Sequence, residues 1–134
     1  FQPFAERSLA SGGHLLYAAA NRGPTAYTSF YTTREALARR REDFQGLARA
    51  CQRAVCAVYD EGGASAAHAL IDYFPDVPSE LLGRAIDRYV SLELYNRTGV
   101  LNRQGFDRLR QSMRSAGFIT TGADYERCVD NSVL

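Results

Sequence analysis

The helical spacing of apolar residues, which begins near residue 32 and continues almost to the end of the chain, constrains the fold more than any other feature. Its clearest stretch has apolar side chains at three- and four-residue steps, at Phe44, Leu47, Ala48, Cys51, Val55 and Val58. Such steps place side chains along one stripe of an α-helix, here of roughly five turns. We therefore expect a largely helical region whose apolar stripes pack against other parts of the protein.

Residues that favour helix ends divide this region into separate helices. Thr32 to Glu35 form a capping-box pattern, in which Thr32 accepts a hydrogen bond from the backbone N–H of residue 35. The pattern predicts a helix that starts near Arg34. The glycine pair Gly62-Gly63 is expected to end the long helix that carries the apolar stripe.

The last helix has a start signal and a stop signal. Asn102 can cap it, and Gly117 can supply the left-handed residue just past its end. The hydrophobic pair Phe118-Ile119 follows at once. We expect this pair to fold the C-terminal tail back over the helix.

Two short segments near the start of the chain have the composition of β-strands. Residues 14–20, HLLYAAA, form a compact apolar run, and residues 26–33, AYTSFYTT, are rich in aromatic and β-branched side chains. The turn between them contains Gly23-Pro24. Because two strands alone make a poor sheet, the pattern indicates part of a larger α/β protein.

Composition excludes several partners and mechanisms. The chain has 134 residues, 46% hydrophobic and 23% charged, which is typical of one globular domain and not of a disordered chain. A formal net charge of +1 gives no overall field to attract nucleic acid or an anionic membrane surface. Lysine is absent, which excludes a P-loop lysine and a Schiff-base lysine. No stretch approaches the roughly 18 apolar residues of a membrane-spanning helix.

The histidines and cysteines form no pattern of metal or catalytic chemistry. His14 and His68 stand alone, without a second ligand at a spacing such as H-E-x-x-H, so no metal site is expected. In a helix, the Cα atoms of Cys51 and Cys56 lie roughly 8.6 Å apart, beyond disulfide reach. Cys51 is expected to be a small buried side chain. A bridge from the long helix to Cys128 is possible, but three free thiols are the expectation.

Segments that follow one another along the chain resemble a known family. They are FQPFAERSL, AYTSFYTTREAL, FQGLARACQRAVCAVYDEG, DYFPDVPSELLGRAIDRY, LNRQGFDRLRQSMRSAGFI and YERCVDNSVL. Taken in this order, they are similar to the substrate-binding proteins of ABC importers in the nitrate, sulfonate, taurine and thiamine-pyrimidine group. The first resembles the W-[ED]-P-F segment of that family. The match covers nearly the whole chain and implies the C-terminal portion of such a protein.

The resemblance implies a fold as well. It is an α/β fold of the type II periplasmic-binding-protein kind, with two lobes and a ligand cleft between them. This chain would be a mostly helical C-terminal part with about two strands. Residues 1–31 would form the end of the second lobe and the crossover strand, and residues 32–134 would be helices that return to the first lobe. Since the chain does not begin with methionine, we expect the missing strands and any export signal upstream.

Ligand contacts are implied at two places. In the family they fall on the acidic residue of W-[ED]-P and on the strands that cross between the lobes. Gln2 stands at the acidic position, with Phe1 in place of the tryptophan, so hydrogen-bonding capacity is kept while the charge is lost. Tyr27, Thr28 and Ser29 are the other candidates, because they lie on the crossover segment.

By this resemblance, the protein is the solute-binding component of an ABC importer, which holds a small organic or inorganic solute and delivers it to a membrane permease without chemistry or cofactor. It would act in the periplasm or another extracytoplasmic compartment, lipid-anchored or soluble, and would not bind nucleic acid. The isolated chain is expected to pair with another copy through an exposed apolar face. Two alternatives stay open: an enzyme of the same fold that makes the thiamine-pyrimidine precursor, and a stand-alone helical interaction domain.

Overall fold

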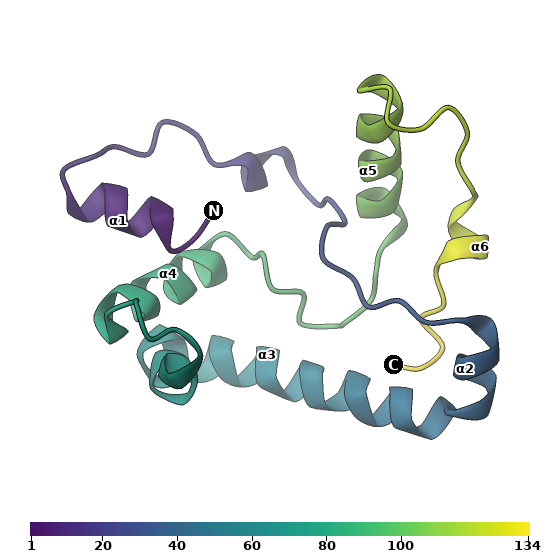
Figure 1. Ribbon diagram of the computed structural model, residues 1–134, viewed down its shortest axis with the longest axis horizontal. Coiled ribbons are helices and arrows are strands. Elements are labelled where there is room, and N and C mark those ends of the chain that lie inside the picture. The colour runs from purple at the N-terminus through teal and green to yellow at the C-terminus, as the bar shows by residue number, and fades with distance from the viewer. The chain divides into compact units, whose positions relative to one another are not determined.

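Helices are the only regular secondary structure in the computed structural model, which describes all residues from 1 to 134 (Figure 1). In chain order these are α1 (Phe4–Ala10), a 3-10 turn (Ala19–Arg22), α2 (Arg34–Arg39), α3 (Arg41–Leu70), a second 3-10 turn (Ile71–Tyr73), α4 (Ser79–Ser91), α5 (Arg103–Ser115) and α6 (Tyr125–Cys128). The prediction that the region after residue 32 is largely helical is therefore confirmed.

The predicted fold class is wrong. The chain contains no strand, and so it is not an α/β two-lobe fold with about two strands. Residues 14–18 have no regular structure and run into the first 3-10 turn, while residues 26–33 are irregular with a bend at Thr28. Side chains with high strand propensity fit well on the pleated surface of a sheet. Neither segment has a partner strand with which to form a sheet, so neither becomes a strand.

The chain divides into two compact units, and the division falls inside α3. The first unit comprises Phe1–Asn21 and Gln52–Arg97, and the second comprises Arg22–Cys51 and Thr98–Leu134. Each unit is therefore built from two stretches that are distant in the sequence.

A small hydrophobic core holds the first unit together. It forms where one face of α4 meets the end of α3 and the loop before α4, and its buried members are Ala67, Val77, Leu81, Leu82 and Ile86. Half-buried apolar side chains pack against it, namely Val58, Ala66, Ile71, Val90 and Tyr95. Each leucine or isoleucine buried here contributes about 2 kcal/mol of hydrophobic stabilisation.

Two adjacent glycines shape α3. Gly62 has a φ of 82°, which interrupts the helix, so the prediction that the long helix ends at this pair is confirmed, although a helical stretch continues to Leu70. Gly63 is buried and lies close to the backbone oxygen of Gly83 in α4, and its N–H donates to Asp87 Oδ1 at 2.6 Å. The absence of a side chain at Gly63 thus permits a close approach of the two helices.

The second unit has no buried hydrophobic side chain; the core residues all belong to the first unit. Arginine side chains instead connect its segments by donating to main-chain carbonyl oxygens. Arg34 donates to Arg127 O at 2.8 Å, and Arg41 donates to Ser132 O at 2.6 Å. A guanidinium has several donors in a fixed planar group, which suits it to such contacts.

The C-terminal tail of the second unit is held by a polar clasp around Leu101. Its backbone N–H donates to Asn131 Oδ1 at 3.2 Å, and its carbonyl oxygen accepts from Tyr125 Oη and from Asn131 Nδ2. Asn131 Nδ2 also donates to Tyr125 Oη at 2.9 Å. The Tyr125 ring packs edge-on against Phe106 of α5, with ring centroids 5.6 Å apart.

The predicted helix ends of α5 are confirmed, whereas the predicted hydrophobic anchor of the tail is wrong for Phe118, and Ile119 is half-buried. Asn102 Oδ1 accepts from the N–H of Gly105 at 2.7 Å, and Gly117 has a φ of 72°. The N–H of Phe118 donates to Met113 O at 2.9 Å, which completes a Schellman motif. The Phe118 side chain, however, is 79% exposed, because the tail leaves the helix here and is fixed further on by the clasp.

The predicted cap of α2 is shifted by one residue. Thr33, rather than Thr32, is the N-cap residue, and its hydroxyl accepts from the N–H of Ala36 at 3.1 Å. The helix begins at Arg34, as expected.

Candidate functional site

A polar cluster joins α1 to α4 in the first unit. Gln2 lies just before α1, where its side-chain Oε1 accepts from the N–H of Glu6 at 3.1 Å and its Nε2 donates to Glu6 Oε1 at 3.3 Å. The backbone N–H of Gln2 donates to Tyr89 Oη at 3.2 Å. From α4, Arg88 Nε donates to the same Glu6 oxygen. The four residues thus form one connected network, the Glu6 network.

Glu6 is the only buried charged residue of the chain, with 4% of its surface exposed. The hydrogen bond from Arg88 holds the pKa of Glu6 below its ordinary value, burial works in the opposite direction, and the hydrogen bond from Gln2 adds to the lowering. Glu6 is therefore an ionised carboxylate at neutral pH. Its ion pair with Arg88 is better shielded than the others in the chain, because the Glu6 side chain is only 5% exposed.

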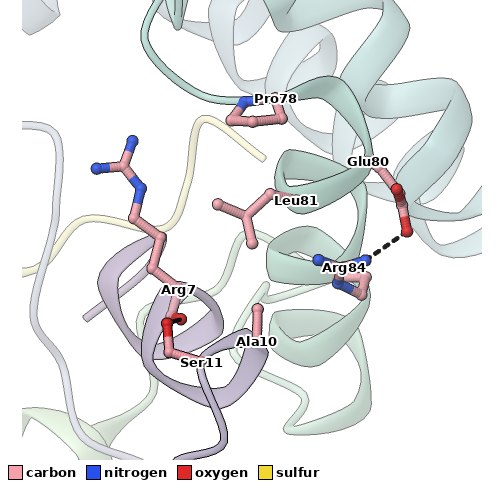
Figure 2. A pocket seen from close by; sticks show the side chains of 7 residues that line it. All are labelled: Arg7, Ala10, Ser11, Pro78, Glu80, Leu81 and Arg84. Carbon is pink, nitrogen blue, oxygen red and sulfur yellow. Dashed lines mark hydrogen bonds and ion pairs between the residues drawn. The ribbon is translucent and has the colours of Figure 1, made fainter.

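An open cavity of about 450 Å³ lies between α1 and the start of α4. Figure 2 shows its lining, in which Leu81 stands between the α1 side chains and the Pro78 ring. The cavity is lined by Arg7, Ala10, Ser11, Pro78, Glu80, Leu81 and Arg84. Arg84 Nη1 pairs with Glu80 Oε1 at 2.5 Å, and the Arg7 guanidinium donates to Asp76 O at 2.8 Å. The cavity combines an apolar wall with two guanidinium groups.

A second cavity, of about 320 Å³, is lined by Glu6, Arg84, Asp87, Arg88 and Ser91. Arg84 lines both cavities, so its guanidinium is available to a molecule in either. A guanidinium recognises planar or tetrahedral oxyanions with paired N–H groups. The two cavities are thus lined by arginine, serine and carboxylate groups. We refer to them together as the α1–α4 site.

The structure places the predicted ligand residues in different units. Gln2 is half-buried in the first unit and touches the α1–α4 site through Glu6, although both sides of its amide are engaged by that residue. Tyr27, Thr28 and Ser29 are consecutive in the second unit, where Tyr27 is 72% exposed and Ser29 is half-buried. The ligand roles of all four stay predictions.

Glu6, Arg84 and Arg88 are not among the residues predicted from the sequence. A signal was present in their spacing. Glu80, Arg84 and Arg88 are four residues apart, which places them along one side of a helix. Gln2 and Glu6 have the same spacing at the start of the chain.

The remaining candidates for chemistry are separate from one another. His14 and His68 are exposed, and no group of three or more His, Cys, Asp or Glu side chains is placed to hold a metal ion. All three cysteines are free; Cys51 is half-buried rather than buried, as is Cys56, and Cys128 is exposed. No helix has the length and apolar character needed to cross a membrane.

Comparison of the chain with protein-family models, with curated proteins and with solved structures finds no match.

Proposed function

We propose that this chain takes part in solute capture for an ABC importer, as the solute-binding component or a portion of it. Its role is to hold a small solute of the nitrate, sulfonate, taurine or thiamine-pyrimidine type for a membrane permease, without transforming it. The binding component would work in the periplasm or another extracytoplasmic space.

One observation supports the proposal most. The resemblance implies that Gln2 contacts the ligand, and Gln2 belongs to the same hydrogen-bond network as Glu6 and Arg88. Glu6 and Arg88 both line an open cavity. Arg84 lies one helical turn earlier on α4 and lines both cavities. Its pairing with Glu80 is solvent-exposed, with 46% of the Arg84 side chain and 85% of the Glu80 side chain accessible. Exposed pairs of this kind contribute little to stability, so the guanidinium can turn to a solute at small cost.

Calorimetric titration with nitrate, taurine and an aminopyrimidine tests this function. We expect one of these solutes to bind the wild-type chain and Arg84→Gln to weaken that binding roughly tenfold or more, because a charge-assisted hydrogen bond is lost. Arg39→Gln is the matched control, since Arg39 pairs with exposed Glu35 at the same four-residue spacing on α2. Equal affinity in the two variants, or no binding to the wild type, would contradict the proposal.

A stand-alone helical interaction domain is the second candidate, and the absence of strands favours it. Such a domain would unfold cooperatively as a monomer and would bind none of the three solutes. Sedimentation together with thermal unfolding separates this candidate from the first, which predicts an increase in the unfolding temperature with solute.

A further inference from the structure

The larger of the two cavities, of about 450 Å³, has an apolar wall. Ala10, Pro78 and Leu81 form this wall, and the Leu81 side chain lies between α1 and the Pro78 ring (Figure 2). The smaller cavity is lined only by residues with a charged group or a hydroxyl. Of the two cavities, the larger one is therefore the one that offers a complementary surface to the apolar part of a solute.

The charges around the larger cavity favour an anion. Its lining contains the guanidiniums of Arg7 and Arg84 and the single carboxylate of Glu80, which leaves one positive charge without a counter-charge. Because Glu80 is paired with Arg84, the uncompensated charge is that of Arg7. In the smaller cavity, two guanidiniums are matched by two carboxylates, and the charges cancel.

Arg7 is placed to hold an oxyanion. Its Nη2 donates to the carbonyl oxygen of Asp76 at 2.8 Å, which ties the side chain to the loop before α4 without neutralising its charge. This is the only hydrogen bond of the Arg7 guanidinium, so its Nε and Nη1 donors stay open to a ligand. A guanidinium pairs two N–H groups with two oxygens of one carboxylate or sulfonate.

On the basis of the proposed function, we infer that the solute of the α1–α4 site is an apolar organic monoanion, a carboxylate or a sulfonate. Its oxyanion pairs with Arg7, and its hydrocarbon part lies against Leu81 and Pro78. Nitrate fits less well because it has no apolar part, and an aminopyrimidine because it has no oxyanion. Taurine fits less well because its ammonium group would lie against the apolar wall, where it loses water without gaining a partner.

Calorimetric titration of the full chain with alkanesulfonates, from methanesulfonate to hexanesulfonate, tests the role of the apolar wall. Affinity should rise with chain length, by up to roughly fourfold for each methylene that the cavity buries. Hexanesulfonate should bind at least roughly tenfold more tightly than taurine or nitrate. The carboxylates from acetate to hexanoate form a second series that distinguishes the two kinds of oxyanion. A rise in affinity along either series supports the inference.

Arg7→Gln tests the role of the guanidinium. We expect this variant to lose roughly tenfold in affinity at every chain length, because a charge-assisted pair of hydrogen bonds is lost. It should keep the gain per methylene, which also shows that the apolar wall is still folded. Arg53→Gln is the matched control, since Arg53 is an exposed arginine of α3 that lines neither cavity, and its effect should be less than about twofold.

An affinity that does not change with chain length would overturn the inference, as would equal affinities of Arg7→Gln and Arg53→Gln for hexanesulfonate. If taurine or nitrate binds the wild type as tightly as hexanesulfonate does, and Arg84→Gln weakens that binding, the inference fails while the proposed function stands. If no solute of either set binds, both fail.

Discussion

Two glycines of α3 differ in how closely they are packed. A Cβ built on Gly63 would collide with the backbone oxygen of Gly83 and approach Asp87 Oδ1 to 2.7 Å, whereas a Cβ on Gly46 meets nothing within 4 Å. Backbone atoms in a packed helix cannot move aside easily. We expect Gly63→Ala to lower the free energy of unfolding by about 1–3 kcal/mol.

Gly46→Ala is the matched control for this prediction. It should raise stability by about 0.5–1 kcal/mol, because alanine is the better helix former. Urea unfolding of the two variants measures both effects. Similar effects from the two substitutions would show that α3 and α4 do not approach closely at Gly63.

Glu6 makes stability depend on pH. The pKa of Glu6 in the folded protein is lowered below the ordinary value of 4.5. The contribution of Glu6 to the free energy of unfolding is therefore fully present above pH 4.5 and is lost as pH falls through the folded pKa. Unfolding measured between about pH 6 and about pH 3 should therefore show a loss of stability on acidification. Glu6→Gln should be less stable than the wild type near pH 6 and should lose less on acidification. Glu35→Gln, on the exposed side of α2, is expected to keep the wild-type pH profile.

At the scale of elements, the ends of α5 are its best-defined features. Asn102 satisfies one of the free N–H groups of the first turn. Asn102→Ala should cost about 1 kcal/mol, and Asn102→Ser should cost less, because serine also accepts this hydrogen bond. Helix content and urea unfolding measure the difference. An alanine variant as stable as the serine variant would mean that the cap contributes nothing.

Local signals such as this cap explain which parts of the fold were predictable. A cap or a glycine affects the backbone within only a few residues, so its effect can be predicted locally. The structure confirms the helix interruption at Gly62, the cap at Asn102 and the helix end at Gly117. Residues 26–33 have strand composition, but a strand exists only with a partner, which their own sequence does not supply. The four-residue spacing indicates that Gln2 lies near Glu6 and Arg84 near Arg88, but the contact of Arg88 with Glu6 spans 82 positions, and no local pattern could predict that contact.

At the scale of the whole molecule, the two units are stabilised differently. The first has a hydrophobic core, while the second is held by arginine-to-carbonyl contacts and the clasp around Leu101. Exposed polar contacts contribute less than apolar burial. Hydrogen exchange should therefore be slower in residues 81–86 of α4 than in residues 106–110 of α5. Equal protection would mean that the units unfold together.

The most direct test of the proposed solute function is an NMR titration of the isotope-labelled chain with the solute that binds in calorimetry. We predict that the largest changes in amide shift fall on Gln2, Glu6, Arg84, Arg88 and Ser91, which form or adjoin the α1–α4 site. Changes confined to Tyr27, Thr28 and Ser29, or no changes at saturating solute, would contradict the assignment of solute binding to the α1–α4 site.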